Sequence, residues 1–180
     1  VAVNCPTSMR IEEIAGKLGA KVYRAEVGEA NVVNLAAEKR SEGYDVRIFG
    51  EGSNGGTITY PSAVRDPINT IFAIIKLLSI TDLYKIWCEK SGAEFKENYT
   101  LTDILSSIPE YTTTGVSEPR AVLRIETKDH AVLKGRFQKI FESQWKEQKV
   151  FLENEGITNY EAVITNGTKE TRGVTDFSLS

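Results

Sequence analysis

The chain has 180 residues, of which 41% are hydrophobic and 26% are charged, and its formal net charge is −3. This composition is that of an ordinary globular protein, large enough for one domain or two small ones. The weak negative charge and the lack of a basic patch argue against a nucleic-acid partner. The longest apolar run, residues 71–78, is too short to span a membrane, and no signal-peptide pattern opens the chain. We therefore expect a cytoplasmic protein that binds neither nucleic acid nor membrane.

Histidine and cysteine are scarce. His130 is the only histidine, which excludes Ser-His-Asp triads and metal sites with several histidines. The two cysteines, Cys5 and Cys88, lie far apart in a chain without secretory features, so free thiols are favoured over a disulfide.

The first part of the chain alternates between strand and helix patterns. The segments are a strand at residues 1–4, a helix at 11–18, a strand at 21–25, a helix at 31–41 and a strand at 45–49. This order predicts a right-handed, three-layer α/β/α unit with a mainly parallel sheet. Ligands bind such sheets at the carboxyl ends of the strands.

Three polar segments follow these strands, at residues 5–8, 26–29 and 50–54, and we expect them to meet at one edge of the sheet. The third opens a stretch with four glycines in seven residues, 50–56, where a ligand can approach the backbone closely. Glu51, Ser53 and Asn54 supply a carboxylate, a hydroxyl and a carboxamide, which suit a polyhydroxylated ligand. The alternative is that the stretch is only a glycine-rich hairpin.

Helical patterns dominate the next part of the chain. Asp66 is the predicted N-cap of a helix that has Pro67 in its first turn. This helix, residues 68–78, is apolar on most sides, so we expect it to be central to the packing. A further helix is predicted at residues 82–90, and a short one at 101–108.

The character of the chain changes after Pro119. A strand is predicted at residues 121–126, and a long helix begins at Asp129 with aromatic residues at four-residue spacing. A last strand at residues 161–165 leads into Asn-Gly, a strong hairpin signal. These elements predict an incomplete α+β module. We therefore divide the chain into an α/β domain at 1–95, a linker at 96–119 and a partial α+β module at 120–180.

The motifs, taken in order, resemble a known family. Pro-Thr-Ser stands at residues 6–8, Val-Gly-Glu-Ala-Asn-Val at 27–32, Gly-Glu-Gly-Ser-Asn-Gly-Gly at 50–56, and Arg-Asp at 65–66. The chain resembles the phosphohexomutases (phosphoglucomutase/phosphomannomutase). Their third domain has Gly-Glu-x-Ser/Asn-Gly as its sugar-recognition loop, followed by Arg/Lys-Asp at a helix start. The resemblance is good over residues 1–80 and loose beyond them.

The resemblance implies roles for individual residues. Glu51 is the carboxylate expected to accept hydrogen bonds from the sugar hydroxyls O3 and O4. Ser53 or Asn54 completes that contact, because either one aligns with the Ser/Asn of the motif. Arg65 is expected at the substrate phosphate, and the remaining substrate-binding residues at this edge are Ser8, Gly28 and Glu29.

The resemblance also implies what lies outside this sequence. The family's phosphoserine loop, metal-binding loop and Arg-containing phosphate loop are not found here, so we expect no catalytic and no metal-binding residue in this chain. The chain resembles the third domain and the beginning of the fourth. The whole enzyme would use Mg²⁺, with ligands elsewhere, and would interconvert hexose 1-phosphate and 6-phosphate through a bisphosphate. Its partners would be a hexose phosphate and the other domains of the same enzyme.

Two other readings stay open. The chain could be a non-catalytic α/β module that binds a sugar or a nucleotide, or a structural fragment. A dinucleotide site is disfavoured, because no Gly-x-Gly-x-x-Gly follows the first strand. Glucose, mannose and amino sugars are all compatible with the sequence.

Overall fold

The computed structural model describes residues 1–52, 56–111, 126 and 129–176. The chain divides into two compact units, one formed by residues 1–114 and 165–170 and the other by residues 115–164 and 171–180. The finer division expected from the sequence, with a linker at residues 96–119, stays a prediction. None of the helices in the described part of the chain is long and apolar enough to cross a membrane.

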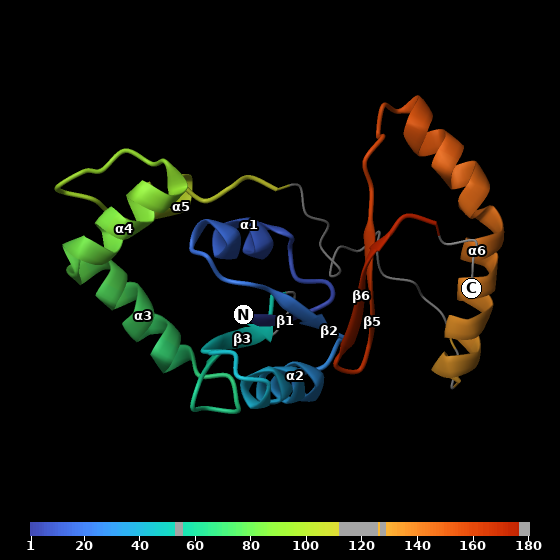
Figure 1. Cartoon of the computed structure of the whole chain (residues 1–180), viewed down its shortest axis with the longest axis horizontal. Helices are drawn as coiled ribbons and strands as arrows, with labels where there is room; N and C mark the ends of the chain where they lie inside the picture. Colours follow the sequence, from blue (N-terminus) through green and yellow to red (C-terminus); the bar gives the residue numbers. More distant parts are fainter. Residues whose placement is uncertain (53–55, 112–125, 127–128, 177–180) are drawn as a thin grey trace. The chain divides into compact units, whose positions relative to one another are not determined.

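The first unit is built on a four-stranded sheet in the order β2-β1-β3-β4 (Figure 1). The central strand β1 (Ala2–Asn4) pairs in parallel with both β2 (Tyr23–Ala25) and β3 (Ile48–Glu51). The last strand, β4 (Gly56–Thr59), runs antiparallel to β3. The predicted third strand starts at residue 45, but β3 begins at residue 48. The pairing of β3 explains this shift, because its ladder with β4 starts only where Ile48 faces Thr59, and its ladder with β1 where Phe49 faces Ala2.

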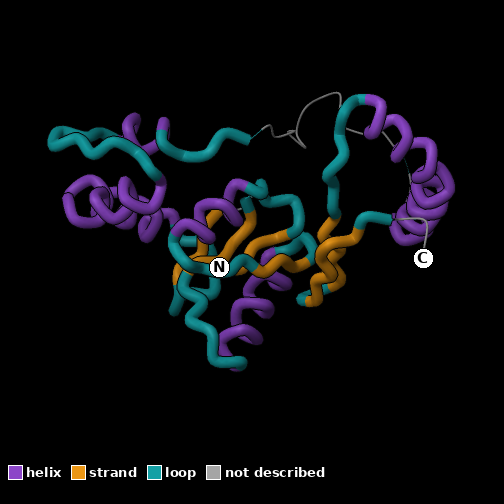
Figure 2. The backbone as a smooth tube through the Cα atoms, turned by 45° about the horizontal axis from the view of Figure 1, so that its top comes forward, coloured by secondary structure: helices purple, strands orange, loops and turns teal. Residues whose placement is uncertain are grey.

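Two helices cover the sheet. Because β2 and β3 lie on opposite sides of β1, right-handed crossovers place α1 (Arg10–Lys17) and α2 (Glu29–Ser41) on opposite faces (Figure 1). Figure 2 shows the same alternation of strands (orange) and helices (purple) along this part of the backbone. The structure therefore confirms the predicted α/β/α arrangement with a mainly parallel sheet.

The core of this unit lies largely between the sheet and α2. Apolar residues from β1, β2, β3, β4 and α2 form one buried cluster, and full burial of a large apolar side chain contributes about 1.5–3 kcal/mol. Its members are Ala2, Ala25, Val32, Leu35, Ala36, Val46, Phe49 and Ile58. This packing fixes α2 on the sheet and so fixes the position of its N-terminus.

Three helices follow the sheet: α3 (Pro67–Ser79), α4 (Thr81–Ser91) and α5 (Leu101–Ser106). Asp66 caps α3 as predicted, since its Oδ1 accepts a hydrogen bond of 2.9 Å from the backbone N–H of Ile68. α4 and α5 share a small core of Tyr84, Cys88 and Ile104. The ring of Tyr99 stacks on that of Tyr84 with 3.8 Å between ring centroids.

α3 differs from its prediction. None of its residues, all of which the structure describes, is buried, although the sequence favoured a central helix. Ile68, Ile71 and Phe72 are 61%, 55% and 56% exposed. The main contacts of α3 are with β4 and α4, and they cover it only in part: Thr70 and Leu77 are half-buried, and Leu77 packs on the small core of α4 and α5. A helix with apolar residues on most sides is therefore buried only where other segments of the chain pack against it.

The second unit contains the long helix α6 (His130–Asn154), which starts where the sequence predicted. The Asp129 side chain accepts a hydrogen bond of 3.0 Å from Val132 N and caps the helix. The rings of Phe137, Phe141 and Trp145 stack in series, at centroid distances of 6.3 and 5.9 Å. The strand predicted at residues 121–126 falls outside the described residues except for Glu126, which is not in a strand.

A hairpin closes the described chain. β5 (Ala162–Asn166) and β6 (Lys169–Val174) form a two-stranded sheet, and the turn between them has Gly167 at a φ of 58°, which confirms the predicted Asn-Gly turn. The tip of the hairpin belongs to the first unit. Glu26 N donates to Gly167 O (2.8 Å), and Gly167 N donates to Glu26 Oε2 (2.9 Å). The tip thereby caps the end of β2, the edge strand of the four-stranded sheet.

Candidate functional site

Three segments meet at the carboxyl ends of the parallel strands. Gly28 N, after β2, donates a hydrogen bond of 2.9 Å to Glu51 Oε1 at the end of β3. Gly52 N donates a hydrogen bond of 2.9 Å to Thr7 Oγ1, in the loop after β1. The structure thus confirms that the polar segments predicted from the strand–helix order come together at one edge.

Glu51 is held at this edge by two hydrogen bonds. Its Oε1 accepts two hydrogen bonds, from Asn4 Nδ2 (3.1 Å) and from Gly28 N (2.9 Å). Gly28 is the N-cap residue of α2, so the carboxylate lies at the positive end of the helix dipole. Within the part of the chain that the structure describes, Oε2 makes no hydrogen bond. That oxygen can accept one from a ligand.

Glycines allow the backbone at this edge to pass close to its neighbours. Gly50 has a φ of 153°, and a Cβ at this position would lie only 2.2 Å from Gly56 O on the paired strand. A Cβ on Gly52 would lie 2.7 Å from Cγ2 of Thr7. Residues 50 and 52 are therefore restricted to glycine by close contacts. Ser53 and Asn54, the two predicted sugar contacts, lie outside the described residues.

Arg65 and Glu29 form an ion pair beside the same edge. Arg65 Nη2 and Nε lie 2.6 and 2.7 Å from Glu29 Oε2, and the two side chains are 43% and 29% exposed. The Arg65 side chain also passes over Gly56, which is the residue paired with Glu51. Two of the predicted substrate residues thus face each other close to Glu51.

Ser8 has a local structural role. Its Oγ accepts a hydrogen bond of 3.2 Å from Arg10 N at the start of α1, and its carbonyl oxygen accepts from Ile11 N and from Arg24 Nη2. The serine shapes the turn from β1 into α1. Its place at the sheet edge agrees with the sequence prediction, and any contact of its hydroxyl with substrate stays a prediction.

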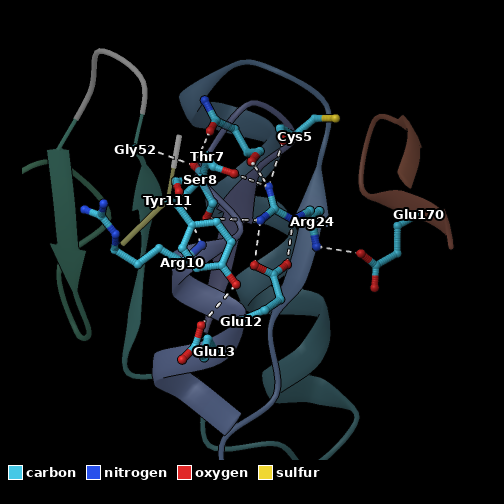
Figure 3. Close-up of polar contacts among 11 residues, drawn as sticks. Cys5, Thr7, Ser8, Arg10, Glu12, Glu13, Arg24, Gly52, Tyr111 and Glu170 are labelled. Atoms are coloured by element: carbon cyan, nitrogen blue, oxygen red, sulfur yellow. Dashed lines mark hydrogen bonds and ion pairs between the residues drawn. The ribbon is translucent and has the colours of Figure 1, made fainter. Parts of the chain in front are cut away.

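A buried arginine that sequence reasoning missed holds the loop after β1 (Figure 3). Arg24 is 1% exposed, and its Nη1 donates to the carbonyl oxygens of Cys5 (2.7 Å) and Thr7 (2.6 Å). Its Nε and Nη2 each lie 2.7 Å from a different carboxylate oxygen of Glu12. A charged residue inside a strand that is otherwise apolar was the signal that could have revealed this role.

Asn4 and Thr7 were also missed as site residues. Asn4 is fully buried at the end of β1, where its Nδ2 donates to Glu51. Its Oδ1 accepts a hydrogen bond of 2.5 Å from Thr7 Oγ1. The available signal was a polar residue at the carboxyl end of a central strand. Only the fold shows that Asn4 faces Glu51, which lies at the end of the neighbouring strand β3.

Two ionisable groups near α1 have altered acidity. Hydrogen bonding and the charge of Lys17, with a hydrogen bond from Tyr111, hold the pKa of Glu13 below its ordinary value. The Tyr111 hydroxyl donates to Glu13 over 3.1 Å, and this bond raises the pKa of Tyr111 (Figure 3). Both changes stabilise the ordinary charge states at neutral pH and create no acid or base for catalysis.

A cavity of about 500 Å³ adjoins the edge. Thr7, Glu51 and Gly52 line it together with apolar residues such as Val3 and Ile48. A second cavity of about 460 Å³ is lined by Arg65, and both cavities touch Gly56 and Thr57. Among the residues described, no group of three or more His, Cys, Asp or Glu side chains could hold a metal ion. Polar groups of Thr7, Glu51 and Arg65 thus border two adjoining cavities at this edge.

Of the comparisons with known proteins, the one with protein families gives a match. No curated protein and no solved structure gives a significant match to the chain. The family described as phosphoglucomutase/phosphomannomutase, alpha/beta/alpha domain III, matches residues 1–109, which include the whole four-stranded sheet and α1 to α5. The chain therefore belongs to the phosphoglucomutase/phosphomannomutase family and contains its α/β/α domain III.

Proposed function

We propose that this chain carries the sugar-recognition site of a phosphohexomutase, an isomerase that interconverts hexose 1-phosphate and hexose 6-phosphate by phosphoryl transfer. The observation that carries the proposal is the placement of Glu51. Its carboxylate stands where three strand ends meet, with Oε1 held by two N–H donors and Oε2 open to a ligand. The chain's family agrees with this assignment.

The chemistry of such an enzyme explains why one carboxylate is useful. The hexose bisphosphate has to bind in two orientations, and its O3 and O4 hydroxyls roughly exchange places between them. A carboxylate that accepts hydrogen bonds from both hydroxyls serves either orientation. Each hydrogen bond to a charged group contributes about 1.5–3 kcal/mol. Ser53 or Asn54 would add a polar contact from the neighbouring loop.

Arg65 is the proposed phosphate contact. A guanidinium fork matches phosphate geometry, and Arg65 stands beside the residue paired with Glu51. Its ion pair with Glu29 is partly exposed, so it contributes little to stability, and a dianionic phosphate can compete for the same donors. Glu29 then orients Arg65 before the substrate arrives. Gly28 acts through its N–H on Glu51, and Ser8 through the loop beside it.

The catalytic groups of the enzyme belong to other parts of the protein in this proposal. Mg²⁺ and the phosphorylated serine would be supplied by other domains, as the resemblance to the phosphohexomutases implies. The role proposed for this chain is to bind and orient the hexose. A cytoplasmic location and contacts with the other domains are parts of the same proposal.

Replacement of Glu51 tests the proposal. In the active enzyme that contains this chain, Glu51→Ala should lower kcat/KM about a hundredfold, because two hydrogen bonds worth about 3 kcal/mol together are lost. The loss should be similar in the 1-phosphate and 6-phosphate directions. Glu42→Ala is the matched control, since Glu42 is a carboxylate just beyond the opposite end of α2. Wild-type kinetics for Glu51→Ala would show that the glycine-rich loop is only scaffolding.

A binding experiment separates the mutase from a non-catalytic module. The chain is titrated with glucose 1-phosphate, glucose 6-phosphate and the corresponding mannose phosphates, and NMR shifts of the residues 26–29 and 50–56 are followed. Arg65→Ala should weaken the binding of sugar phosphates more than the binding of free sugars. Glu51→Ala should weaken the binding of both classes. Binding of sugars without any effect of the phosphate would favour the non-catalytic sugar-binding module.

A further inference from the structure

A continuous hydrogen-bonded path joins the end of β3 to the loop after β1. Gly52 N donates to Thr7 Oγ1 (2.9 Å), Thr7 Oγ1 donates to Asn4 Oδ1 (2.5 Å), and Asn4 Nδ2 donates to Glu51 Oε1 (3.1 Å). The path starts and ends on two adjacent residues, so it forms a closed loop of contacts around the end of β3.

The chemistry of the groups gives this path one direction. A carboxylate has no proton to donate, so Glu51 is an acceptor from the amide of Asn4. The side-chain carbonyl oxygen of Asn4 must then face Thr7, and it accepts a hydrogen bond from the Thr7 hydroxyl. The lone pairs of the Thr7 hydroxyl remain available for Gly52 N–H. The Asn4 amide therefore has one orientation that satisfies both Glu51 and Thr7, and in that orientation it points N–H at Glu51.

The framework behind the path is rigid. Asn4 is fully buried, and Arg24, only 1% exposed, donates to the carbonyl oxygens of Cys5 and Thr7. The bidentate contact with Glu12 ties the same guanidinium to α1. The backbone that carries Asn4 and Thr7 is therefore fixed from behind by charge-assisted hydrogen bonds, which are stronger than those between neutral groups.

We propose that Asn4, oriented by Thr7, is a positioning residue for Glu51: it holds Oε1 so that Oε2 presents its lone pairs to the sugar hydroxyls. This inference rests on the proposed function of Glu51 as the sugar carboxylate. A carboxylate on a flexible side chain would lose rotational freedom when it binds sugar. Asn4 and Gly28 N fix that rotation in advance, which reduces the entropic cost of binding.

Thr7 offers a matched pair of variants for the test. Thr7→Val keeps the shape of the side chain but removes the hydroxyl, whereas Thr7→Ser keeps the hydroxyl. Affinity for glucose 1-phosphate is measured by NMR titration of the 180-residue chain. Thr7→Val should lower the affinity about tenfold, the effect of about one lost hydrogen bond. Thr7→Ser should stay within about twofold of the wild type, since the path is intact.

Asn4→Asp tests the same path by its dependence on pH. The variant places a second carboxylate against Glu51, and two such groups at this distance share one proton as the pH falls. The affinity relative to the wild type at the same pH should be lowest at pH 7 to 8 and should recover toward pH 5. The charged pairs Glu29–Arg65 and Glu12–Arg24 are common to both proteins, so their titration cancels in the ratio. Thr7→Val should show no such recovery.

The outcomes are distinct. A Thr7→Val variant with wild-type affinity, a Thr7→Ser variant as weak as Thr7→Val, or an Asn4→Asp deficit independent of pH would each overturn the positioning role. If Asn4→Asp does not fold, the Thr7 pair decides alone. Glu51→Gln keeps the size of the side chain and separates this inference from the function: wild-type affinity in Glu51→Gln would overturn the sugar site itself, whereas reduced affinity there beside an unaffected Thr7→Val would overturn only the role of Asn4.

Discussion

Two regions of the first unit are held together in opposite ways. At the carboxyl ends of the strands, polar groups are buried: Asn4 is fully buried and Arg24 is 1% exposed, and both are hydrogen bonded. Along α3, apolar side chains are exposed, with Ile68 and Phe72 at 61% and 56%. The usual relation between hydrophobicity and burial is reversed in both regions.

The difference shows that the precise placement of a segment does not depend on how many apolar residues it contains. A buried polar group is costly unless its partners are in place, so it tolerates few arrangements of the chain around it. An exposed apolar side chain specifies no arrangement. The strand ends are thus suited to hold a ligand-binding carboxylate in one position. The surface of α3 contributes little to the stability of this unit.

The largest effect is expected from Arg24→Met. The change removes the guanidinium from the Glu12 carboxylate and the donors that the loop carbonyls share, so it should cost about 3–5 kcal/mol in unfolding free energy. Urea unfolding of the chain measures this cost.

The double variant Arg24→Met/Glu12→Gln is the control for the first prediction. It also removes the Glu12 charge that has lost the guanidinium, and it should recover part of the lost stability. Equal stability of the wild type and Arg24→Met would mean that the strand ends are not held by this guanidinium, and the contrast with α3 would disappear.

A second prediction compares one isoleucine from each region. Ile58 on β4 is fully buried in the core between the sheet and α2, whereas Ile71 on α3 is 55% exposed. Ile58→Ala should lower the unfolding free energy by about 2–5 kcal/mol, and Ile71→Ala should change it by less than about 0.5 kcal/mol. Thermal and urea unfolding of both variants provide the measurement. A large loss for Ile71→Ala would show that α3 packs against a partner in solution.

The same contrast shows what sequence reasoning can and cannot reach. The parallel sheet and the meeting of three loops were predictable, because the order of strands and helices fixes which chain segments reach the same edge. The placement of Glu51 and Gly28 at this edge was predictable, because they follow the expected strands at residues 45–49 and 21–25. Both positions depend on the topology of the sheet, which follows from the order of strand and helix patterns along the sequence.

The missed features depend on contacts between distant residues. Arg24 occupies a strand position, and nothing local indicates that it donates to the loop after a different strand. Asn4 gains its role only because β3 pairs with β1 and brings Glu51 beside it. The exposure of α3 was missed for the same reason, since hydrophobicity reports what a helix can bury and does not report which surface is available to cover it.

A smaller effect than that of Ile58→Ala is expected at the start of α5, which is held by a polar cap. Thr100 Oγ1 and the Asp103 carboxylate form a capping box, and Lys96 Nζ lies 2.5 Å from Asp103. Thr100→Ala should cost about 1 kcal/mol at pH 7, and Thr100→Ser should be close to the wild type. Urea unfolding of the two variants, followed by the fluorescence of Trp87, whose Nε1 donates to Ser107 just after α5, gives the comparison.

This cap also predicts how the region responds to acid. Hydrogen bonds from Lys96 and then from Thr100 hold the pKa of Asp103 well below its ordinary value of 3.8. A carboxyl group with a lowered pKa contributes its stabilisation above the unfolded value and loses it as the pH falls through the folded value. The contribution of the Asp103 charge should therefore be nearly constant from pH 7 to about pH 5 and fall progressively in stronger acid. Asp103→Asn should be less stable than the wild type at pH 7, and the difference between the two proteins should shrink steadily as the pH falls below about 5. A constant difference at every pH would show that the Asp103 charge does not hold α5, so that this helix would depend on its other contacts.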